Sequence, residues 1–273
     1  MVDHMTQRYC VSVRRACRVI RMARRVHAYR SVRDPRTGLR QRMRELAQIR
    51  VRYGYRRIGV LLQREGWSIG PHVLRRVYGE EGLVLRPRRP RRHVTAVRRQ
   101  RSGIEASAPN VVWAMDFVHD ELRDGRRFRA LTIVDLHTRE CLAIDVGQHL
   151  RGEHVVAALD RIRNHRGVPK YLRTDHGSEF ISRIVDLWAY QHQVAMDFTR
   201  PGKPTDNGHV ESFNGRLREE CLNTHWFRNI EEAQREIDAW RKDYNESRPH
   251  RTLGGLTPCE YAAKAANEGR KLA

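Results

Sequence analysis

The spacing of hydrophobic residues changes abruptly along this chain of 273 residues, and that change constrains the fold more than any other feature. Across residues 37–82, apolar side chains such as Met43 and Leu46 recur every three to four positions, which predicts amphipathic helices. From Val111 onward they gather in short β-branched runs with polar residues between them, which predicts strands. The chain is therefore expected to join a helical part to a part that contains a sheet.

The helical part contains a sharp break. Gly66 is placed to end one helix, Ser68 to Gly70 form a short turn, and Pro71 suits the first position of a new helix that reaches Glu81. The sequence therefore predicts a helix, a tight turn and a second helix.

The stretch that separates the two parts is rich in Arg and Pro and poor in apolar residues, which is typical of a linker. We expect three segments: a basic helix-turn-helix region over residues 1–85, the linker over 86–105, and a second domain with a C-terminal helix and tail over 106–265.

The second part begins with three short strands, and Asp124-Gly125 marks a hairpin between the first two. Helices and strands then alternate, which predicts a mixed α/β fold, a five-stranded sheet with helices on its faces, in the order of ribonuclease H-like proteins. The expected strands are Val111–Val118, Phe128–Asp135, Cys141–Gly147, Tyr171–Asp175 and Ala195–Thr199, and the expected helices are His154–His165, Ile181–His192, Asn207–Cys221 and Ile230–Asn245.

The positive charge lies in one half of the chain. The formal net charge is +21, and 48 of the 53 basic residues are Arg. Residues 1–101 carry 28 basic against 6 acidic residues, or +22, and the remaining residues carry 25 against 26, or −1. Such a basic half predicts a polyanionic partner, usually nucleic acid.

The cysteines and the hydropathy indicate in which compartment the protein is expected. Five cysteines with no close pair indicate neither a disulfide framework nor a zinc site, which fits a reducing cytosol. No apolar run approaches the roughly 20 residues that a membrane span needs. We therefore expect a cytoplasmic protein that does not enter a membrane.

Three acidic residues are candidates for catalysis. Asp116 lies within the apolar run VVWAMDFV, Asp175 ends a strand in RTDHGSEF, and Glu211 begins a helix in GHVESFNGRLREEC. Any one acid of this kind is more often a helix cap, a surface charge or a salt-bridge partner. Three that converge on one sheet edge would suit hard divalent cations, which prefer oxygen ligands.

Other candidate residues are placed by helical spacing. Asn214 and Arg218 follow Glu211 at i+3 and i+7, so the three share a helix face. In the basic half, the helix predicted over Pro71–Glu81 would turn His72, Arg75 and Arg76 away from its apolar face and toward a DNA major groove. A plain helical hairpin would show the same pattern. The candidate DNA-binding residues are Arg218, Asn214, His72, Arg75, Arg76, Arg56 and Arg57.

The C-terminal region carries two further expectations. Trp240 and Tyr244 lie on an amphipathic helix and are interpreted as packing residues. Arg248 and His250 leave two interpretations open, an approach to DNA or a solvated turn.

At the carboxylates the sequence resembles the transposases of bacterial insertion sequences, specifically the catalytic second-reading-frame product of insertion-sequence family three, which is related to retroviral integrases. The resemblance runs from about Tyr53 to Ala262, and its marks are YGYRRIGVLLQREG, WAMDFVHDELRDGRRFRALTIVD, TDHGSEF, PGKPTDNGHVESFNGRLREECLN and YNESRPHRTLGGLTPCEY.

The resemblance implies a DDE transposase with an integrase catalytic core. Asp116, Asp175 and Glu211 would bind the catalytic metal, Mg²⁺ or Mn²⁺ and two ions, and Arg218 would contact DNA. One strand would be cut at a transposon end, and the freed 3′-hydroxyl would attack another phosphodiester. The implied partners are double-stranded DNA at transposon ends and target, further copies of the chain on that DNA, and a first-reading-frame product as partner or fusion.

This sequence departs from the family at His176, where many relatives have Asn, and it has no His-His-Cys-Cys zinc motif before the core. Two other functions stay open at this point. A DNA-binding regulator without catalysis would need no acid trio, and a ribonuclease H-like nuclease would not need the Arg-rich recognition helices.

Overall fold

The computed structural model describes residues 1–30, 35–85, 104–199 and 208–272. The predicted linker lies outside the described residues except for its last two positions, 104 and 105. Contacts divide the chain into two compact units, Met1–Arg42 and Met43–Ala273. The predicted domain boundary at residue 85 stays a prediction.

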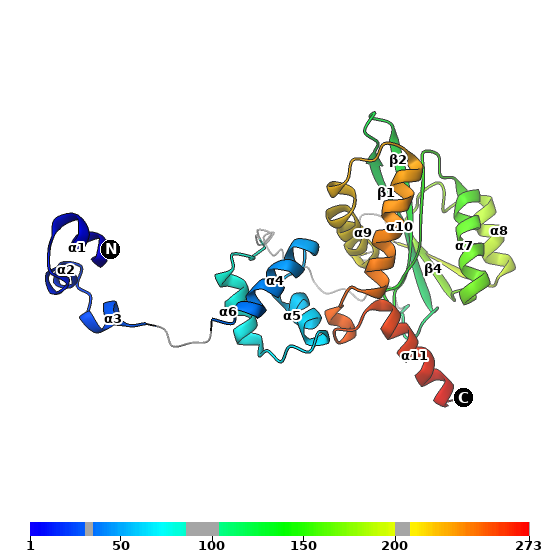
Figure 1. Cartoon of the computed structure of the whole chain (residues 1–273). Coiled ribbons are helices and arrows are strands. Elements are labelled where there is room, and N and C mark those ends of the chain that lie inside the picture. The colour runs from blue at the N-terminus through cyan, green and yellow to red at the C-terminus, as the bar shows by residue number, and fades with distance from the viewer. Residues whose placement is uncertain (31–34, 86–103, 200–207, 273) are drawn as a thin grey trace. The chain divides into compact units, whose positions relative to one another are not determined.

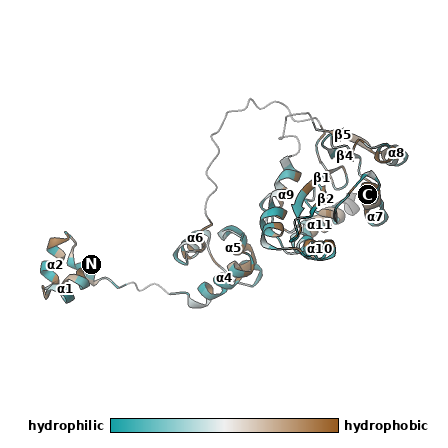
Figure 2. Cartoon of the chain, turned by 90° about the horizontal axis from the view of Figure 1, so that it is seen from above, coloured by the Kyte–Doolittle hydropathy of each residue, from teal (hydrophilic) through white to brown (hydrophobic). Residues whose placement is uncertain are grey.

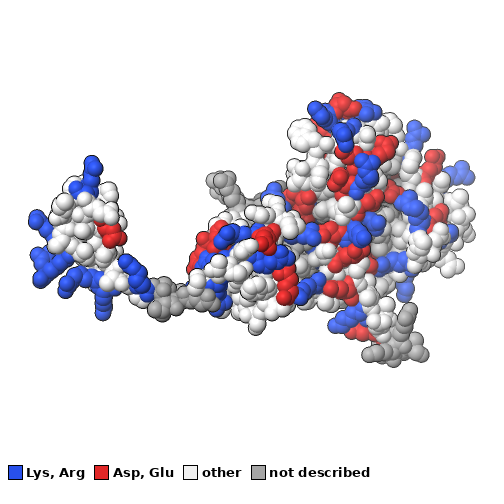
Figure 3. All heavy atoms as spheres, in the orientation of Figure 1, with Lys and Arg blue, Asp and Glu red and all other residues white. Residues whose placement is uncertain are grey.

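The first unit is a small group of helices with a basic surface. Helices α1 (Val2–Tyr9), α2 (Val13–Val19) and α3 (Arg24–Ala28) contain few buried residues. The buried residues are Val2, Ala16 and Cys17. Figure 3 shows Lys and Arg side chains over most of the visible charged surface of this unit.

The second unit begins with a helix-turn-helix, as predicted. Helix α4 (Thr37–Ile49) contains the boundary between the units, and α5 (Tyr55–Arg64) and α6 (Pro71–Glu80) follow. Helices α4 and α5 each carry hydrophilic and hydrophobic residues, coloured teal and brown in Figure 2.

Two glycines make this turn possible. Gly66, with φ of +89°, ends α5 in the left-handed region that favours glycine. Gly59 lets α5 approach α6 closely, because a Cβ there would lie 2.3 Å from Leu74 Cδ2.

The sheet has five strands in the order β3-β2-β1-β4-β5. The first three strands are antiparallel, and β4 and β5 run parallel to β1. The strands are β1 (Val112–Glu121), β2 (Arg127–Asp135), β3 (Cys141–Gly147), β4 (Tyr171–Thr174) and β5 (Ala195–Phe198). The predicted ribonuclease H-like order is therefore confirmed, and the expected strands differ from the observed ones by at most three residues at an end.

Helices cover both faces of the sheet (Figure 1). On one face α7 (Gly152–Arg166) and α8 (Arg183–Gln191) pack on alternate strand residues such as Trp113 and Met115. On the other face α9 (Gly208–Glu220) and α10 (Ile230–Glu246) pack on residues such as Ala114 and Val118. Two short 3-10 turns, η2 (Leu222–Thr224) and η3 (Arg251–Leu253), precede α10 and the last helix α11 (Pro258–Leu272), respectively.

The outer edge of β3 is covered by side chains of α10. Gln234 accepts a hydrogen bond from Val146 N (2.8 Å) and donates one to Ile144 O (2.9 Å). Asn245 makes the same pair of bonds with the backbone of Cys141, both at 2.9 Å. Because these amides satisfy backbone groups that an edge strand leaves unpaired, α10 acts as a partial substitute for a sixth strand.

The aromatic residues of α10 are packing residues, as expected. The Phe213 ring of α9 lies 5.5 Å from the ring of Trp240 and 5.0 Å from that of Tyr244. Tyr244 is 2% exposed.

The interpretation of Arg248 and His250 as a solvated turn is wrong, because both side chains are buried, and an approach to DNA stays a prediction. Arg248 is 2% exposed and His250 is 7% exposed. The Arg248 guanidinium forms a bidentate ion pair with Glu220 of α9. It also lies 5.3 Å from the centre of the Tyr53 ring, just before α5, so a residue next to the helix-turn-helix contacts the core.

Candidate active site

Asp116 is held in the middle of the longest strand. Its position in β1 puts its side chain on the sheet face that α9 covers, between Ala114 and Val118. The carboxylate accepts a hydrogen bond from Phe117 N at Oδ1 and another from Asn214 Nδ2 at Oδ2, both 2.8 Å long. These two bonds fix the orientation of the carboxylate.

The pKa of Asp116 is raised from 3.8 to about 6. Burial is the main cause, and the negative charges of Asp175 and Glu211 raise the pKa further, against the two hydrogen bonds. Asp175 and Glu211 therefore both lie close enough to Asp116 for their charges to act on it.

Asp175 follows β4 directly. Strand β4 lies beside β1 and parallel to it, with Ala114 opposite Arg173. Continuing this register by two residues brings Asp116 level with Asp175, as the sequence predicts for neighbouring strands. Asp175 is exposed, and its Oδ1 accepts a hydrogen bond from Gly177 N at 2.9 Å.

Glu211 lies in the first turn of α9 and is exposed. Val210, Phe213 and Leu217 of the same helix are buried against the sheet. Because these residues recur every three to four positions, they fix one face of α9 on the sheet and leave Glu211 on the exposed face. The predicted loop PGKPTDNG before Glu211 lies outside the described residues, apart from its final Gly208.

The donor set suits a divalent cation, although the ligand arrangement is not preformed. Among residues 1–30, 35–85, 104–199 and 208–272, no three His, Cys, Asp or Glu side chains are grouped closely enough to hold a metal ion. Carboxylate oxygens are the ligands that Mg²⁺ and Mn²⁺ prefer. A cation among the three acids would offset the repulsion that raises the pKa of Asp116.

Asn214 is half-buried beside Asp116. Its amide nitrogen donates to Asp116, and its amide oxygen accepts from Thr132 Oγ1 at 3.0 Å. The predicted DNA contact of Asn214 stays a prediction, and its observed partners are a candidate metal ligand and a buried hydroxyl. Thr132 is a site residue that the sequence interpretation missed.

Arg218 is exposed on α9, two turns after Glu211. Its guanidinium donates to the backbone carbonyl of His119 in β1 at 2.6 Å, which leaves its other N–H groups for a phosphate. His176 is also exposed, and its ring lies 5.3 Å from that of Phe198.

The candidate residues of α6 differ in exposure. His72 and Arg75 are exposed, as predicted for the outer face of the helix. Arg76 is half-buried and lies 3.8 Å from Glu80.

The two candidate arginines of α5, Arg56 and Arg57, differ in the same way. Arg56 is exposed, whereas Arg57 is half-buried with its guanidinium 5.4 Å from the centre of the Tyr53 ring. Burial, followed by the charge of Arg248, lowers the pKa of Arg57.

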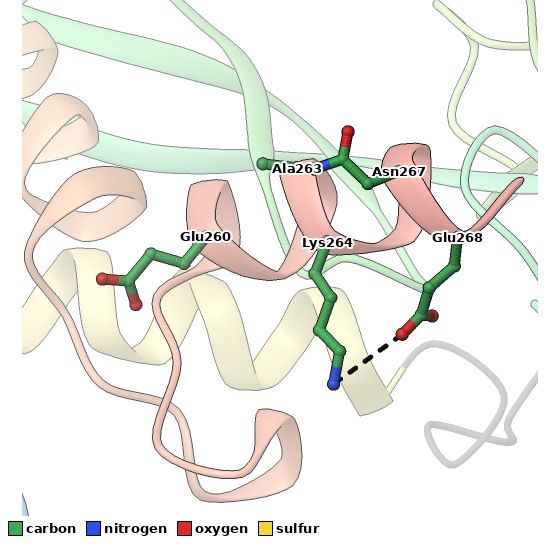
Figure 4. A pocket seen from close by; sticks show the side chains of 5 residues that line it. All are labelled: Glu260, Ala263, Lys264, Asn267 and Glu268. Carbon is green, nitrogen blue, oxygen red and sulfur yellow. Dashed lines mark ion pairs between the residues drawn. The ribbon is translucent and has the colours of Figure 1, made fainter. Parts of the chain in front are cut away.

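A hollow on the described surface lies along α11, away from the carboxylates. It is lined by Glu260, Ala263, Lys264, Asn267 and Glu268 (Figure 4). Lys264 and Glu268 form an exposed ion pair of 3.8 Å across one helical turn of α11. None of the helices in the described parts of the chain is long and apolar enough to cross a membrane.

Family models match most of the chain. Residues 35–91 match an HTH-like domain, and residues 106–204 and 192–258 match two models of the integrase core domain.

The chain is 46% identical over 255 residues to the insertion element IS407 uncharacterized 31.7 kDa protein of Burkholderia multivorans, covering 93% of this chain and 91% of that protein. It is 40% identical to the insertion element IS476 uncharacterized 39.2 kDa protein of Xanthomonas euvesicatoria, covering 96% and 75%. It is 29% identical to the putative transposase InsK of insertion sequence IS150 of Escherichia coli, covering 84% of each.

Among solved structures, a chain of the simian T-cell lymphotropic virus intasome in complex with the PP2A regulatory subunit B56 gamma has a similar fold. The TM-score is 0.51 at 19% identity, over 60% of this chain and 56% of that one.

Proposed function

The chain belongs to the insertion-sequence transposases with an HTH-like domain and an integrase core, and on that premise we propose that Asp116, Asp175 and Glu211 are its catalytic residues. The protein is a DDE transposase, a polynucleotidyl transferase that acts in transposition and DNA integration. One observation carries the assignment of the residues: Asp116 is level with Asp175 on the neighbouring parallel strand, and Asn214, one turn after Glu211 on α9, donates to the Asp116 carboxylate.

The three carboxylates would hold Mg²⁺ or Mn²⁺, and their number suits two ions. Two ions about 3.5–4 Å apart activate the attacking oxygen and stabilise the leaving oxygen of a phosphodiester. Asp116 would bind with its two hydrogen-bonded oxygens already oriented by Phe117 and Asn214. Asp175 and Glu211, both exposed, would move toward it.

The reaction would proceed as DNA cleavage followed by strand transfer. Water would cut one strand at a transposon end, and the freed 3′-hydroxyl would attack a phosphodiester of the target in line. Arg218 would hold a phosphate beside the carboxylates through the N–H groups that His119 does not use. No residue of the chain needs to form a covalent intermediate.

Recognition of DNA would come from the basic half. The exposed side chains of His72, Arg75 and Arg56 are proposed to read or grip a duplex, with Arg76 and Arg57 contributing less because they are half-buried. Several copies of the chain would assemble on two transposon ends, and a first-reading-frame product could supply further recognition. This action on DNA would place the protein in the cytoplasm, on the nucleoid.

Substitution of the carboxylates tests this proposal. Asp116→Asn, Asp175→Asn and Glu211→Gln should each abolish Mg²⁺-dependent cleavage and joining of a labelled end, and should leave DNA binding within about twofold, since phosphate contacts dominate affinity. Asp186→Asn on the exposed side of α8 is the matched control and should keep full activity. Normal cleavage by any of the three variants removes that residue from the site. Cleavage without joining would favour a nuclease, and binding without either activity in the unsubstituted chain would favour a regulator.

A further inference from the structure

Thr132 is a polar residue in an otherwise apolar stretch of β2. It lies opposite Asp116 in the register of β1 and β2, and its side chain is fully buried. Ala130 and Val134, which point to the same sheet face as Thr132, are also buried, so a valine would suit the packing at this position equally well. A buried hydroxyl is costly unless it makes hydrogen bonds, which indicates that the hydroxyl of Thr132 has a use.

The hydroxyl has two possible acceptors. Thr132 Oγ1 lies 3.0 Å from Asn214 Oδ1 and 3.1 Å from the backbone oxygen of Asp116. A hydroxyl carries a single proton, and here it is shared between two oxygens. The oxygen end of the Asn214 amide faces Thr132, because the nitrogen end is turned toward the Asp116 carboxylate, which only accepts hydrogen bonds.

This orientation determines what Asn214 presents to Asp116. With the amide oxygen toward Thr132, the amide nitrogen faces the carboxylate and donates to Oδ2 at 2.8 Å. The reversed amide would place its oxygen against an ionised carboxylate, where two acceptors repel each other. The Thr132 hydroxyl thus supplies the donor that the amide oxygen needs in the orientation in which the amide nitrogen binds Asp116.

We propose that Thr132 and Asn214 are positioning residues: the Thr132 hydroxyl orients the Asn214 amide, and the amide holds the Asp116 carboxylate where it can share a cation with Asp175 and Glu211. The proposal rests on the catalytic role proposed for Asp116. Side chains that orient a metal ligand through hydrogen bonds commonly change metal affinity or activity by about 10–100-fold when they are removed.

The test compares Thr132→Val with Thr132→Ser in the full chain. Valine keeps the shape and removes the hydroxyl, whereas serine keeps the hydroxyl and removes a methyl group. Thr132→Val should weaken Mn²⁺ binding, measured by calorimetry, and lower kcat for strand joining, each by about tenfold. KM for DNA should stay within about twofold, since the substitution touches no group that holds a phosphate. Thr132→Ser should restore both quantities.

A double substitution tests whether Thr132 acts on Asp116 through Asn214. Asn214→Ala should show the same losses, and adding Thr132→Val to it should cause little further loss, because both act on Asp116 through one amide. Additive losses would overturn the proposed relay. Equal losses in Thr132→Val and Thr132→Ser would also overturn it, since they would point to packing.

Two controls separate this proposal from other effects. Thr257→Val removes another buried hydroxyl, which caps α11 by accepting from Glu260 N at 3.2 Å, and should lower stability without changing Mn²⁺ affinity. Asp116→Asn is measured alongside. If it abolishes joining while Thr132→Val behaves as the unsubstituted chain, only the positioning role fails. If Asp116→Asn keeps its activity, the proposed function and the positioning role both fail.

Discussion

At the scale of single residues, Asp116 is the position where burial and chemistry conflict. A carboxylate in the middle of a buried strand loses hydration, and its two hydrogen bonds compensate only in part, so its pKa lies at about 6. The charged form that metal binding requires is therefore destabilising for the fold in the absence of a cation.

This conflict predicts a pH dependence of stability in metal-free protein. Because the folded pKa of Asp116 is about 6 and its ordinary value is 3.8, the folded state keeps a proton between these values that the unfolded state releases. The free energy of unfolding should therefore fall as pH rises through this window, and the loss is complete above it.

Asp116→Asn should remove that dependence, and near neutral pH it should melt at a higher temperature than the unsubstituted chain. A change of 1 kcal/mol shifts the melting temperature by roughly 2–4 °C in a domain of this size. Thermal unfolding in a chelator at several pH values measures the difference, which should shrink toward pH 4. Identical melting curves for the two proteins at every pH would contradict this origin of the shift.

Arg218 allows a second prediction at this scale. Arg218→Ala should weaken binding of terminal DNA or its joining by about tenfold, since a charge-assisted hydrogen bond is worth about 1.5–3 kcal/mol. Metal affinity, measured by calorimetry, should change little. Arg183→Ala on the exposed side of α8 is the control. Full activity of Arg218→Ala across a range of DNA concentrations would leave Arg218 with only its bond to His119.

At the scale of elements, α6 presents arginines of unequal availability. Arg75 is exposed, and the neighbouring Arg76 is half-buried beside Glu80. Arg75→Ala should therefore weaken DNA binding more than Arg76→Ala does. For every phosphate that a variant no longer neutralises, the slope of log K against log salt should become shallower by about 0.9. Fluorescence anisotropy over a range of salt measures both slopes, and the opposite ranking would mean that another face of α6 meets DNA.

The Arg248–Glu220 pair connects α9 to the segment after α10. Removing one partner of a buried ion pair leaves the other charge uncompensated and costs about 3–5 kcal/mol. Arg248→Ala and Glu220→Ala should each lower the free energy of unfolding in urea by about that amount. Arg248→Met combined with Glu220→Leu should recover much of the loss. A small effect of either single substitution would show that water reaches the pair.

Helices and strands were predictable from the sequence wherever the local spacing of apolar residues and the positions of glycines determine them. The run of β-branched residues at Cys141–Gly147 became β3 with the same ends, and Gly66 ended α5 as its position predicts. Side-chain partners were not predictable in this way. Helical spacing placed Asn214 on the face of Glu211, but only the packing of α9 on the sheet shows that its amide reaches Asp116.

Arg248 and His250 show the same limit more strongly. The segment around them is polar and contains a proline, which is typical of an exposed turn. Arg248 is buried because Tyr53 and Glu220, both distant in sequence, pack around it, and the His250 ring lies 5.1 Å from that of Tyr244. No local pattern carries that information.

At the scale of the whole molecule, charge and chemistry are carried by different parts of the chain. Residues 1–34 alone hold nine Arg against two Asp. They belong to the unit Met1–Arg42, and the carboxylates belong to the other unit.

Deleting residues 1–34 should therefore lower DNA affinity and reduce its salt dependence, by about 0.9 in slope for each phosphate that these residues neutralise. Mn²⁺ affinity should be unchanged, because no candidate ligand is removed. Anisotropy and calorimetry on the same preparations measure the two effects. An unchanged salt slope would show that this unit does not touch DNA.

The amides of Gln234 and Asn245, which cover the edge of β3, also determine how a protein truncated before α10 would behave. A product that stops before α10 would expose the backbone groups of Cys141, Ile144 and Val146, and exposed strand edges on separate molecules pair with one another. We expect such a product to aggregate in the cell instead of persisting as a soluble competitor for transposon ends. Decayed copies of the element that end early would then be silent, and would not act as inhibitors of intact copies.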